Sequence, residues 1–455
     1  MKKIKRRSAI KSIGAISLGM ATSSSLRGEV SNLPRYKEDD RLITDILVVG
    51  GGTAGVVAAI QAGHSGCRTI LVENGSQLGG TITTGGVVFP GLFHAWGRRI
   101  IGGPGWELAR DAVDLEHGFP DFSRSPGRHW HHQVRVNGPL YAMLAEEKCL
   151  EAGVHIRYYE TPTSVEFNNN RWTVEIQGKG VRKQIICNQI IDCTGNAAVT
   201  SLAGYNTLRE AVTQPGSILF ILGGYDYESL DLESIPDQYR NMLRHNWRIL
   251  RGSSGDDDYQ PFTPYSLLVV NGADSTTSES HTLANINGRS QVLETLRKLR
   301  TLPGCEKIKI VDMRPETAVR ETYRIDGVYK ISYSDYINGR IFGDSMSYSF
   351  YPIDLWREGQ PIHQEYLEKD IIATVPLRAL IPKGSTNLIV AGRCVSSDRL
   401  ANSALRVQAS CMGMGQTAGA AAALAFNKKT TPLNVPVDEL KKMIEDHGGI
   451  VPRVS

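Results

Sequence analysis

Three glycines at a fixed spacing, Gly50, Gly52 and Gly55, directly follow a run of apolar residues. In a Gly-x-Gly-x-x-Gly turn the first glycine allows the tight bend, the second lets the backbone approach a pyrophosphate, and the third lets a helix pack closely on a strand. A helix that begins near Thr53 and Ala54 also points its positive end at the phosphates. The spacing therefore predicts a dinucleotide-binding turn.

Glu73 supplies the acidic partner of such a turn. It ends the run Arg68–Glu73, whose β-branched and apolar residues predict a second strand. A carboxylate at that strand end accepts hydrogen bonds from ribose hydroxyls. Together with the glycines, it favours a bound dinucleotide over a purely structural turn.

Histidines are the first candidates for proton transfer. The segment His129-Trp130-His131-His132 gathers imidazoles that exchange a proton near neutral pH, so His129 and His131 are candidate catalytic bases. A surface histidine, or one satisfied inside a core, has the same appearance in a sequence. No cluster with metal-ligand spacing accompanies them, and no metal site is predicted.

Two arginines, Arg320 and Arg324, flank the carboxylate of Glu321. Because they are four positions apart, they share a face of either a strand or a helix and would form a two-pronged cationic site. Such a pair anchors a substrate or cofactor, or belongs to a structural ion-pair network, and the sequence leaves both open.

An α/β fold is predicted to position these residues. The buried run Ile43–Val49, a helix over Val56–Ala62 and the run Arg68–Glu73 form a βαβ unit. Residues 163–186 alternate between apolar and polar around turns, which predicts antiparallel hairpins. The remaining predicted elements are a helix over Leu140–Glu151, parallel strands over Gly153–Tyr158, Gln189–Gly195 and Asn387–Gly392, and a small-residue helix over Ala409–Phe426.

Four stretches resemble the bacterial FAD-dependent oxidoreductase family with the glutathione-reductase-type FAD-binding fold. They are Val48 to Gly55, Glu73 to Thr81, Ile190 to Gly195, and Pro376 to Gly419. The last is the most specific, because it contains Ala391-Gly392-Arg393, Leu405-Arg406-Val407-Gln408 and Gly413-Met414-Gly415-Gln416-Thr417-Ala418-Gly419. Val319 to Gly327 extends the resemblance, whereas residues 216–305 resemble no family that we can place.

The resemblance implies FAD as the cofactor, and a helix start within Gly413–Gly419 would direct peptide N–H groups at the flavin. Arg378, which lies in the same family-like region, joins Arg320 and Arg324 as a candidate for catalysis. The cofactor-binding residues predicted from the motif and the resemblance are Gly50, Gly52, Thr53, Ala54, Gly55, Glu73, Asn74, Gly79, Gly80, Thr81, Thr194, Gly195, Gly392, Arg393, Arg406, Gly415 and Gln416.

The predicted domains are discontinuous. A Rossmann-like FAD-binding domain, with a parallel sheet and an antiparallel hairpin element, covers residues 42–90, 137–212 and 384–430. An inserted mixed α+β substrate lobe covers 91–136 and 213–383, and residues 431–455 form a C-terminal tail.

Missing motifs narrow the chemistry. No second Gly-x-Gly-x-x-Gly turn follows a strand, Arg393 stands where aromatic hydroxylases have an aspartate, and the Trp-x-Trp-x-Ile-Pro motif of flavin halogenases is absent. We therefore expect hydride or electron transfer between FAD and a small polar organic substrate, such as a sugar or hydroxy compound, with a separate electron acceptor. The alternatives are a fumarate-reductase-like reductase of an activated double bond and a redox-inactive protein that binds FAD or a nucleotide.

Residues 1–30 have the layout of an export signal, with a basic cluster, a short apolar stretch and small polar residues. Arg6-Arg7-Ser8-Ala9-Ile10-Lys11 resembles a twin-arginine signal, although Ala9 replaces the usual phenylalanine. An ordinary secretory signal or a basic tail is the alternative. We expect a periplasmic protein without a transmembrane anchor once the signal is removed.

Charge and cysteine content argue against a nucleic-acid-binding protein and against a protein with a redox-active cysteine pair. The formal net charge is +4, but seven basic residues precede position 28, so the remainder carries −3 and offers no basic surface for nucleic acid. Seven scattered cysteines contain no Cys-x-x-Cys pair, and most are expected to be small core residues.

Overall fold

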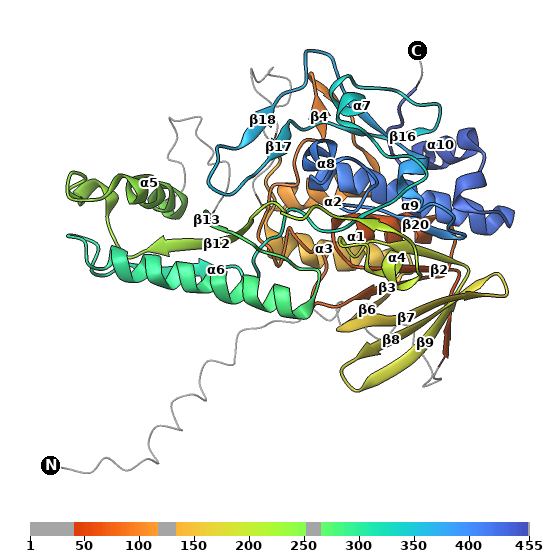
Figure 1. Cartoon of the computed structure of the whole chain (residues 1–455), viewed down its shortest axis with the longest axis horizontal. Helices are drawn as coiled ribbons and strands as arrows, with labels where there is room; N and C mark the ends of the chain where they lie inside the picture. The colour runs from red at the N-terminus through yellow and green to blue at the C-terminus, as the bar shows by residue number, and fades with distance from the viewer. Residues whose placement is uncertain (1–40, 117–132, 252–264, 454–455) are drawn as a thin grey trace, which may run out of the picture. The chain divides into compact units, whose positions relative to one another are not determined.

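A five-stranded parallel sheet lies at the centre of the computed structural model, which describes residues 41–116, 133–251 and 265–453 (Figure 1). The strand order is β20-β10-β2-β3-β6, and every neighbouring pair is parallel. The predicted α/β class is therefore confirmed. The bounds of the strands are β2 Ile46–Val49, β3 Thr69–Glu73, β6 His155–Tyr158, β10 Gln189–Asp192 and β20 Leu388–Val390.

Helices cover one face of this sheet, where Ile46 and Val48 enter the largest apolar core. The two inner helices, α1 and α9, are rich in small residues, and a Cβ atom at Gly419 would lie 2.4 Å from the Ala58 carbonyl oxygen. The two backbones therefore almost touch. The helices of this layer are α1 Thr53–His64, α2 Gly103–Asp114, α3 Gly138–Glu151, α9 Gln408–Lys428 and α10 Val437–Asp446.

An antiparallel meander packs on the other face, where Leu47 and Val49 enter a second core. It consists of β7 Glu160–Asn168, β8 Arg171–Gly178 and β9 Val181–Cys187, as the alternation predicted. The strand predicted over Ile43–Val49 is confirmed only for Ile46–Val49. Its first residue belongs to β1 Arg41–Ile43, which pairs with β9, and Asp45 interrupts the run because its carboxylate binds the Arg68 guanidinium at 2.7 Å.

A lobe with its own apolar core follows the meander in the chain. Its sheet has the order β13-β12-β14, and all pairs are antiparallel. The two long helices lie against β12 in Figure 1. The elements of the lobe are β12 Gly216–Gly223, α5 Asp237–Arg251, β13 Ser266–Val270, α6 Ser278–Leu299 and β14 Lys309–Met313.

The rest of the predicted lobe packs differently. Phe93 and Ile100 from the segment 91–136, and Ile331 and Val375 from the second half of 213–383, all belong to the core of the parallel sheet. The residues predicted as a C-terminal tail likewise include α10, whose Leu440 and Ile444 are buried there. Apolar packing therefore does not follow the boundaries predicted from motifs.

Short elements complete the chain. They are β4 His94–Ala95, β5 Arg98–Arg99, α4 Ala198–Leu202, β11 Thr207–Leu208, β15 Arg324–Ile325, α7 Tyr333–Ile337, β16 Ser345–Ser349, β17 Ile353–Leu355, β18 His363–Glu365, β19 Ala373–Pro376, α8 Arg399–Leu405 and the 3₁₀ turns η3 Tyr227–Ser229, η4 Leu377–Leu380 and η5 Pro432–Asn434.

The structure also bears on the expectations about the cysteines and about membrane-spanning segments. All seven cysteines are unpaired and buried, which confirms that they are core residues. Within the residues described, no helix combines the length and the apolar character needed to cross a bilayer. The export signal over residues 1–30 lies outside the described residues.

Candidate functional site

A cleft of about 750 Å³ runs from the glycine turn to a group of arginines. It opens at the carboxyl ends of β2, β3, β10 and β20, where ligands of parallel α/β sheets bind. Most of the predicted cofactor residues meet in its lining, namely Gly50, Gly52, Thr53, Ala54, Glu73, Asn74, Gly80, Thr81, Thr194, Gly195, Gly392, Arg393 and Arg406.

The glycines of the turn have different surroundings. Gly50 has a φ of +100°, and a Cβ atom there would lie 2.4 Å from the Cys193 carbonyl oxygen. A Cβ atom at Gly55 would lie 1.8 Å from the Gly50 carbonyl oxygen. At Gly52, by contrast, a Cβ atom would meet nothing within 4 Å. The first and third glycines are therefore required by the protein's own packing, whereas the second leaves space open to the cleft.

The start of α1 faces this space without a side-chain cap, because its N-cap residue is Gly52. Uncapped peptide N–H groups at a helix N-terminus bind anions such as phosphate. Gly79 lies directly behind the turn and donates its N–H to the Gly51 carbonyl oxygen at 2.8 Å. The Gly79 hydrogen bond thus fixes one side of the turn, and the side at Gly52 is open to the cleft.

Glu73 is fixed at the end of β3 by two backbone donors. Its Oε2 accepts from the Gly51 N–H and its Oε1 from the Gly75 N–H, both at 2.6 Å. Burial raises the pKa of Glu73, and these two hydrogen bonds oppose that shift. Since each carboxylate oxygen has a second lone pair, Glu73 can also accept from a ribose hydroxyl.

Arg393 connects the glycine turn with the far end of the cleft. Its Nε donates to the Gly195 carbonyl oxygen at 2.9 Å, and its Nη1 donates to the Val319 carbonyl oxygen. Burial lowers the pKa of Arg393, and no described carboxylate forms an ion pair with it. A buried guanidinium in this position favours an anionic ligand.

The predicted helix start within Gly413–Gly419 is wrong, because α9 begins at Gln408. Gly415 lies inside the helix, where its Cα packs on the Ala54 backbone. The Gln416 side chain donates to Gln61 Oε1 at 3.1 Å, away from the lining of the large cleft. The helix start that does line the cleft is Arg406-Val407-Gln408. The helix itself, predicted over Ala409–Phe426, is confirmed to within two residues at each end, and only the part of it assigned to the flavin is wrong.

The far end of the cleft contains Arg320 and residues that the sequence did not indicate. Arg320 donates to the Pro215 carbonyl oxygen at 2.7 Å and to Ser217 Oγ at 2.9 Å, and its guanidinium lies 4.1 Å from the centre of the Trp356 ring. Asp354 and Tyr351 line the same end. Tyr351, Asp354 and Trp356 belong to no sequence motif, so only the structure shows that they line the cleft.

The predicted pairing of Arg320 with Arg324 is not formed. Arg324 is buried and binds Glu210 at 2.6 Å, while Glu321 binds Arg399 at 3.0 Å. The periodicity argument fails because β15 begins only at Arg324, and the residues before it belong to no helix or strand. Glu321 and Arg324 therefore belong to structural ion pairs, and only Arg320 faces the cleft.

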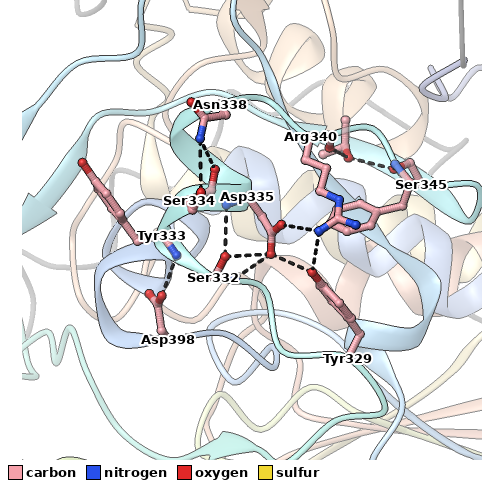
Figure 2. A network of polar contacts seen from close by, with 11 residues as sticks. Tyr329, Ser332, Tyr333, Ser334, Asp335, Asn338, Arg340, Ser345 and Asp398 are labelled. Carbon is pink, nitrogen blue, oxygen red and sulfur yellow. Dashed lines mark hydrogen bonds and ion pairs between the residues drawn. The ribbon is translucent and has the colours of Figure 1, made fainter.

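Arg378 also lies outside the lining of the cleft. Its Nε is 3.2 Å from an Asp344 carboxylate oxygen, and its guanidinium lies 4.9 Å from the centre of the Tyr329 ring. Tyr329 belongs to the polar network of Figure 2, in which Asp335 accepts from Ser332, Tyr329 and Arg340. The candidate catalytic residues His129 and His131 lie outside the described residues.

The network in Figure 2 also positions one of the cleft arginines. Asp398 accepts a hydrogen bond from the Tyr333 N–H at the start of α7. The same side chain caps α8 by accepting from the Ala401 N–H at 2.8 Å. Arg406 is the C-cap residue that directly follows α8, so the network helps to fix the helix next to Arg406. In the described parts of the chain no group of three histidine, cysteine, aspartate or glutamate side chains has a metal-binding arrangement.

Comparison with known proteins gives a family for this geometry. A family model described as FAD dependent oxidoreductase matches residues 45–444. A thiamine thiazole synthase from Aeropyrum pernix is 28% identical over 193 residues, which cover 40% of this chain and 63% of the relative. A dihydrolipoyl dehydrogenase from Pseudomonas aeruginosa is 51% identical over 55 residues, which cover 12% of each chain. These matches span less than two thirds of the length of either relative.

Among solved structures, a geranylgeranyl bacteriochlorophyll reductase-like protein from Thermoplasma acidophilum aligns with 90% of this chain and 84% of its own, at 12% identity and a TM-score of 0.42. The chondrochloren halogenase of a myxobacterium aligns with 89% and 79%, at 14% identity and a TM-score of 0.42.

Proposed function

The chain belongs to the FAD dependent oxidoreductase family, and from this we propose that it oxidises a small polar organic substrate, such as a sugar or hydroxy compound, at FAD held in the cleft. The observation that carries the proposal is the continuity of one cleft from the glycine turn, through Arg393, to the polar end around Arg320. A cofactor and a substrate can therefore share it.

The residues at the glycine turn fit the cofactor. The open space at Gly52 and the uncapped start of α1 suit a pyrophosphate, and Glu73 suits a ribose. Bound FAD supplies hydride or electron transfer, which no side chain provides. The protein's part is to hold the substrate, exclude water and manage one proton.

Tyr351 can orient the substrate oxygen. Burial and the nearby Asp354 carboxylate raise the pKa of Tyr351, so its hydroxyl stays protonated at neutral pH. A neutral phenol in the cleft donates a hydrogen bond to a substrate oxygen. His129 and His131 remain candidate bases by sequence.

Electrons leave to a separate acceptor in this proposal, because the sequence contains no second dinucleotide turn. Export to the periplasm is also part of the proposal and rests on Arg6-Arg7 and the apolar stretch after it. Replacing both arginines with lysine should retain the protein in the cytoplasm. Unchanged export of that double variant would remove the twin-arginine part.

A second candidate, favoured by the cationic end of the cleft, is the reduction of an activated double bond in an unsaturated acid. In this second reaction electrons pass from the flavin to the substrate, and in the first they pass from the substrate to the flavin. Stopped-flow measurements on the same holoenzyme therefore distinguish the two reactions. Reduction of the oxidised flavin by hydroxy compounds supports the first, and reoxidation of the reduced flavin by unsaturated acids supports the second.

The proposal is tested on purified protein by its absorption spectrum, followed by acid precipitation and identification of the released cofactor. Free FAD in the supernatant, together with flavin reduction under anaerobic conditions by a member of a sugar, alcohol and hydroxy-acid panel, supports it. A protein that stays colourless after incubation with FAD contradicts it. A bound flavin that dithionite cannot reduce would instead indicate a redox-inactive binding protein.

A further inference from the structure

Charge is unevenly distributed along the cleft. Two carboxylates, Glu73 and Glu316, line the part of the cleft near the glycine turn, and the Glu316 charge adds to burial in raising the pKa of Glu73. The other end contains the guanidiniums of Arg320 and Arg406 with one carboxylate, Asp354, and Arg393 lies between the two ends. The described residues therefore leave positive charge uncompensated in the part of the cleft that the cofactor motif does not use.

Arg320 is the residue that bears this excess. Its hydrogen-bond and stacking partners in the described structure are neutral: a carbonyl oxygen, a serine hydroxyl and the Trp356 ring. Burial and the neighbouring Arg406 lower the pKa of Arg320, while the Asp354 carboxylate only partly opposes them. A desolvated cation without an ion-pair partner is costly, and proteins retain one where a ligand supplies the counter-charge.

Arg320 and Arg406 contact neighbouring residues at the end of β17: Arg320 stacks on Trp356, and Arg406 binds Asp354. Asp354 lies in β17, and its Oδ2 accepts from Arg406 Nη2 at 3.3 Å and from the Trp356 indole N–H at 3.1 Å. The Trp356 ring in turn stacks on Arg320. The Nε of Arg406 is buried and has no hydrogen-bond partner in the described structure. Two guanidiniums, one with an unused donor, thus converge on Asp354 and Trp356.

We propose that the substrate carries a carboxylate, which binds at Arg320 and Arg406 at the end of the cleft remote from the glycine turn. This inference rests on the proposed function and narrows its substrate to an organic acid. A carboxylate matches guanidinium geometry, accepts the unused Arg406 donor and neutralises Arg320. Trp356 and Asp354 act as positioning residues, because they orient the two guanidiniums.

The test uses the FAD-loaded protein and a readout that needs no turnover. Acetate, glycolate and benzoate are each titrated against their uncharged amides while the flavin absorption band and the melting temperature are recorded. We expect at least one acid to shift the band and raise the melting temperature at concentrations where its amide does neither. Three acids that behave like their amides would overturn the proposal, although FAD binding itself would stand.

The variants assign the effect to the cleft. Arg320→Gln should weaken binding of the responding acid by about tenfold or more, because a charge-assisted hydrogen bond is lost. Arg320→Lys should restore part of this affinity. Arg182→Gln, at an exposed ion pair on the meander, is the matched control and should change nothing. Equal affinities in Arg320→Gln and the unmodified protein would overturn the assignment.

A second variant keeps the test valid if Arg320→Gln does not fold. Trp356→Leu removes the stacked ring and retains both charges, and we expect acid binding weakened by roughly threefold to tenfold. FAD content is measured in every variant. Loss of acid binding together with FAD would contradict a separate substrate site, whereas loss of acid binding with FAD retained supports it.

Discussion

The two ends of the cleft are built by different means. At the glycine turn most contacts come from backbone groups close together in the chain, with Gly50, Gly52 and Gly55 within six residues and the Glu73 carboxylate on the next strand. At the arginine end, Arg320, Asp354 and Arg406 come from three segments that are remote in sequence. A site made by local backbone geometry leaves a spaced motif in the sequence, whereas a site made by side chains from distant segments leaves none.

The largest effect that tests this comparison is expected from Gly55→Ala. The new Cβ atom would lie 1.8 Å from the Gly50 carbonyl oxygen, so α1 must move away from the sheet. We expect no recoverable folded holoenzyme, judged by soluble yield and flavin content. Gly343→Ala is the control, because it also changes a glycine, but its φ is not positive and its Cβ atom meets nothing within 4 Å. Normal flavin content in Gly55→Ala would show that the turn is not set by this packing.

At the arginine end, Arg399→Met should have the next largest effect. It removes the guanidinium partner of Glu321, whose side chain is only 2% exposed. An unpaired buried carboxylate costs about 3–5 kcal/mol of unfolding free energy. Chemical denaturation measures the change, and Arg182→Met should stay within about 1 kcal/mol because its ion pair is exposed. Equal effects of the two variants would mean that the segments at this end are not held by buried charge.

Gly52→Ala separates binding from folding at the glycine turn. Its φ is −70°, and a Cβ atom there meets no protein atom, so the fold should be unchanged. A pyrophosphate that contacts this backbone would meet the new methyl group, at a cost of roughly 1–3 kcal/mol. Titration of the apoprotein with FAD should therefore show weaker binding at an unchanged melting temperature of the apoprotein. Unaltered FAD affinity would place the pyrophosphate elsewhere.

The smallest effect concerns the edge strand β6 of the parallel sheet. Burial and the Arg157 charge lower the pKa of His155 to about 4, from an ordinary 6.5. The unfolded chain therefore takes up a proton first, and stability falls as the pH is lowered from 6.5 towards 4. His155→Asn should flatten this part of the melting-temperature profile, whereas His363→Asn, at a partly exposed site, should not. A profile of the same slope in His155→Asn would exclude this residue as the cause.

The sequence predicted the elements whose burial or backbone geometry requires a recognisable pattern, such as a run of apolar residues or a fixed glycine spacing. The five parallel strands, the meander, α1 and the glycine turn follow from buried apolar runs and glycine spacing. The break at Asp45 was missed, because the sequence does not show that its carboxylate binds Arg68. The helix over Ala409–Phe426 was predicted to within two residues at each end, but the residues of it that line the cleft were not, because small residues occur along its whole length.

The arginines show the limit of such inference. The spacing of Arg320 and Arg324 indicated a shared face, but periodicity has no meaning in a segment without regular structure. Their roles are decided by partners far away in the chain: Glu210 for Arg324, and Pro215 and Ser217 for Arg320. Residue type indicated cationic chemistry, and only tertiary contacts indicate which cation faces the ligand.

The close packing of α9 on α1 has a consequence for how the protein is made. Gln61 and Gln416 touch across these helices although 355 positions separate them, and β20, the edge strand beside β10, also comes late in the chain. On the ribosome the glycine turn is therefore synthesised long before the helix that covers α1 exists. Contacts of such sequence separation form slowly, and apolar surface stays exposed in the meantime. Because Val407, Gln408 and Cys411 line the cleft, the cofactor-binding surface is complete only after this late part of the chain has folded against α1.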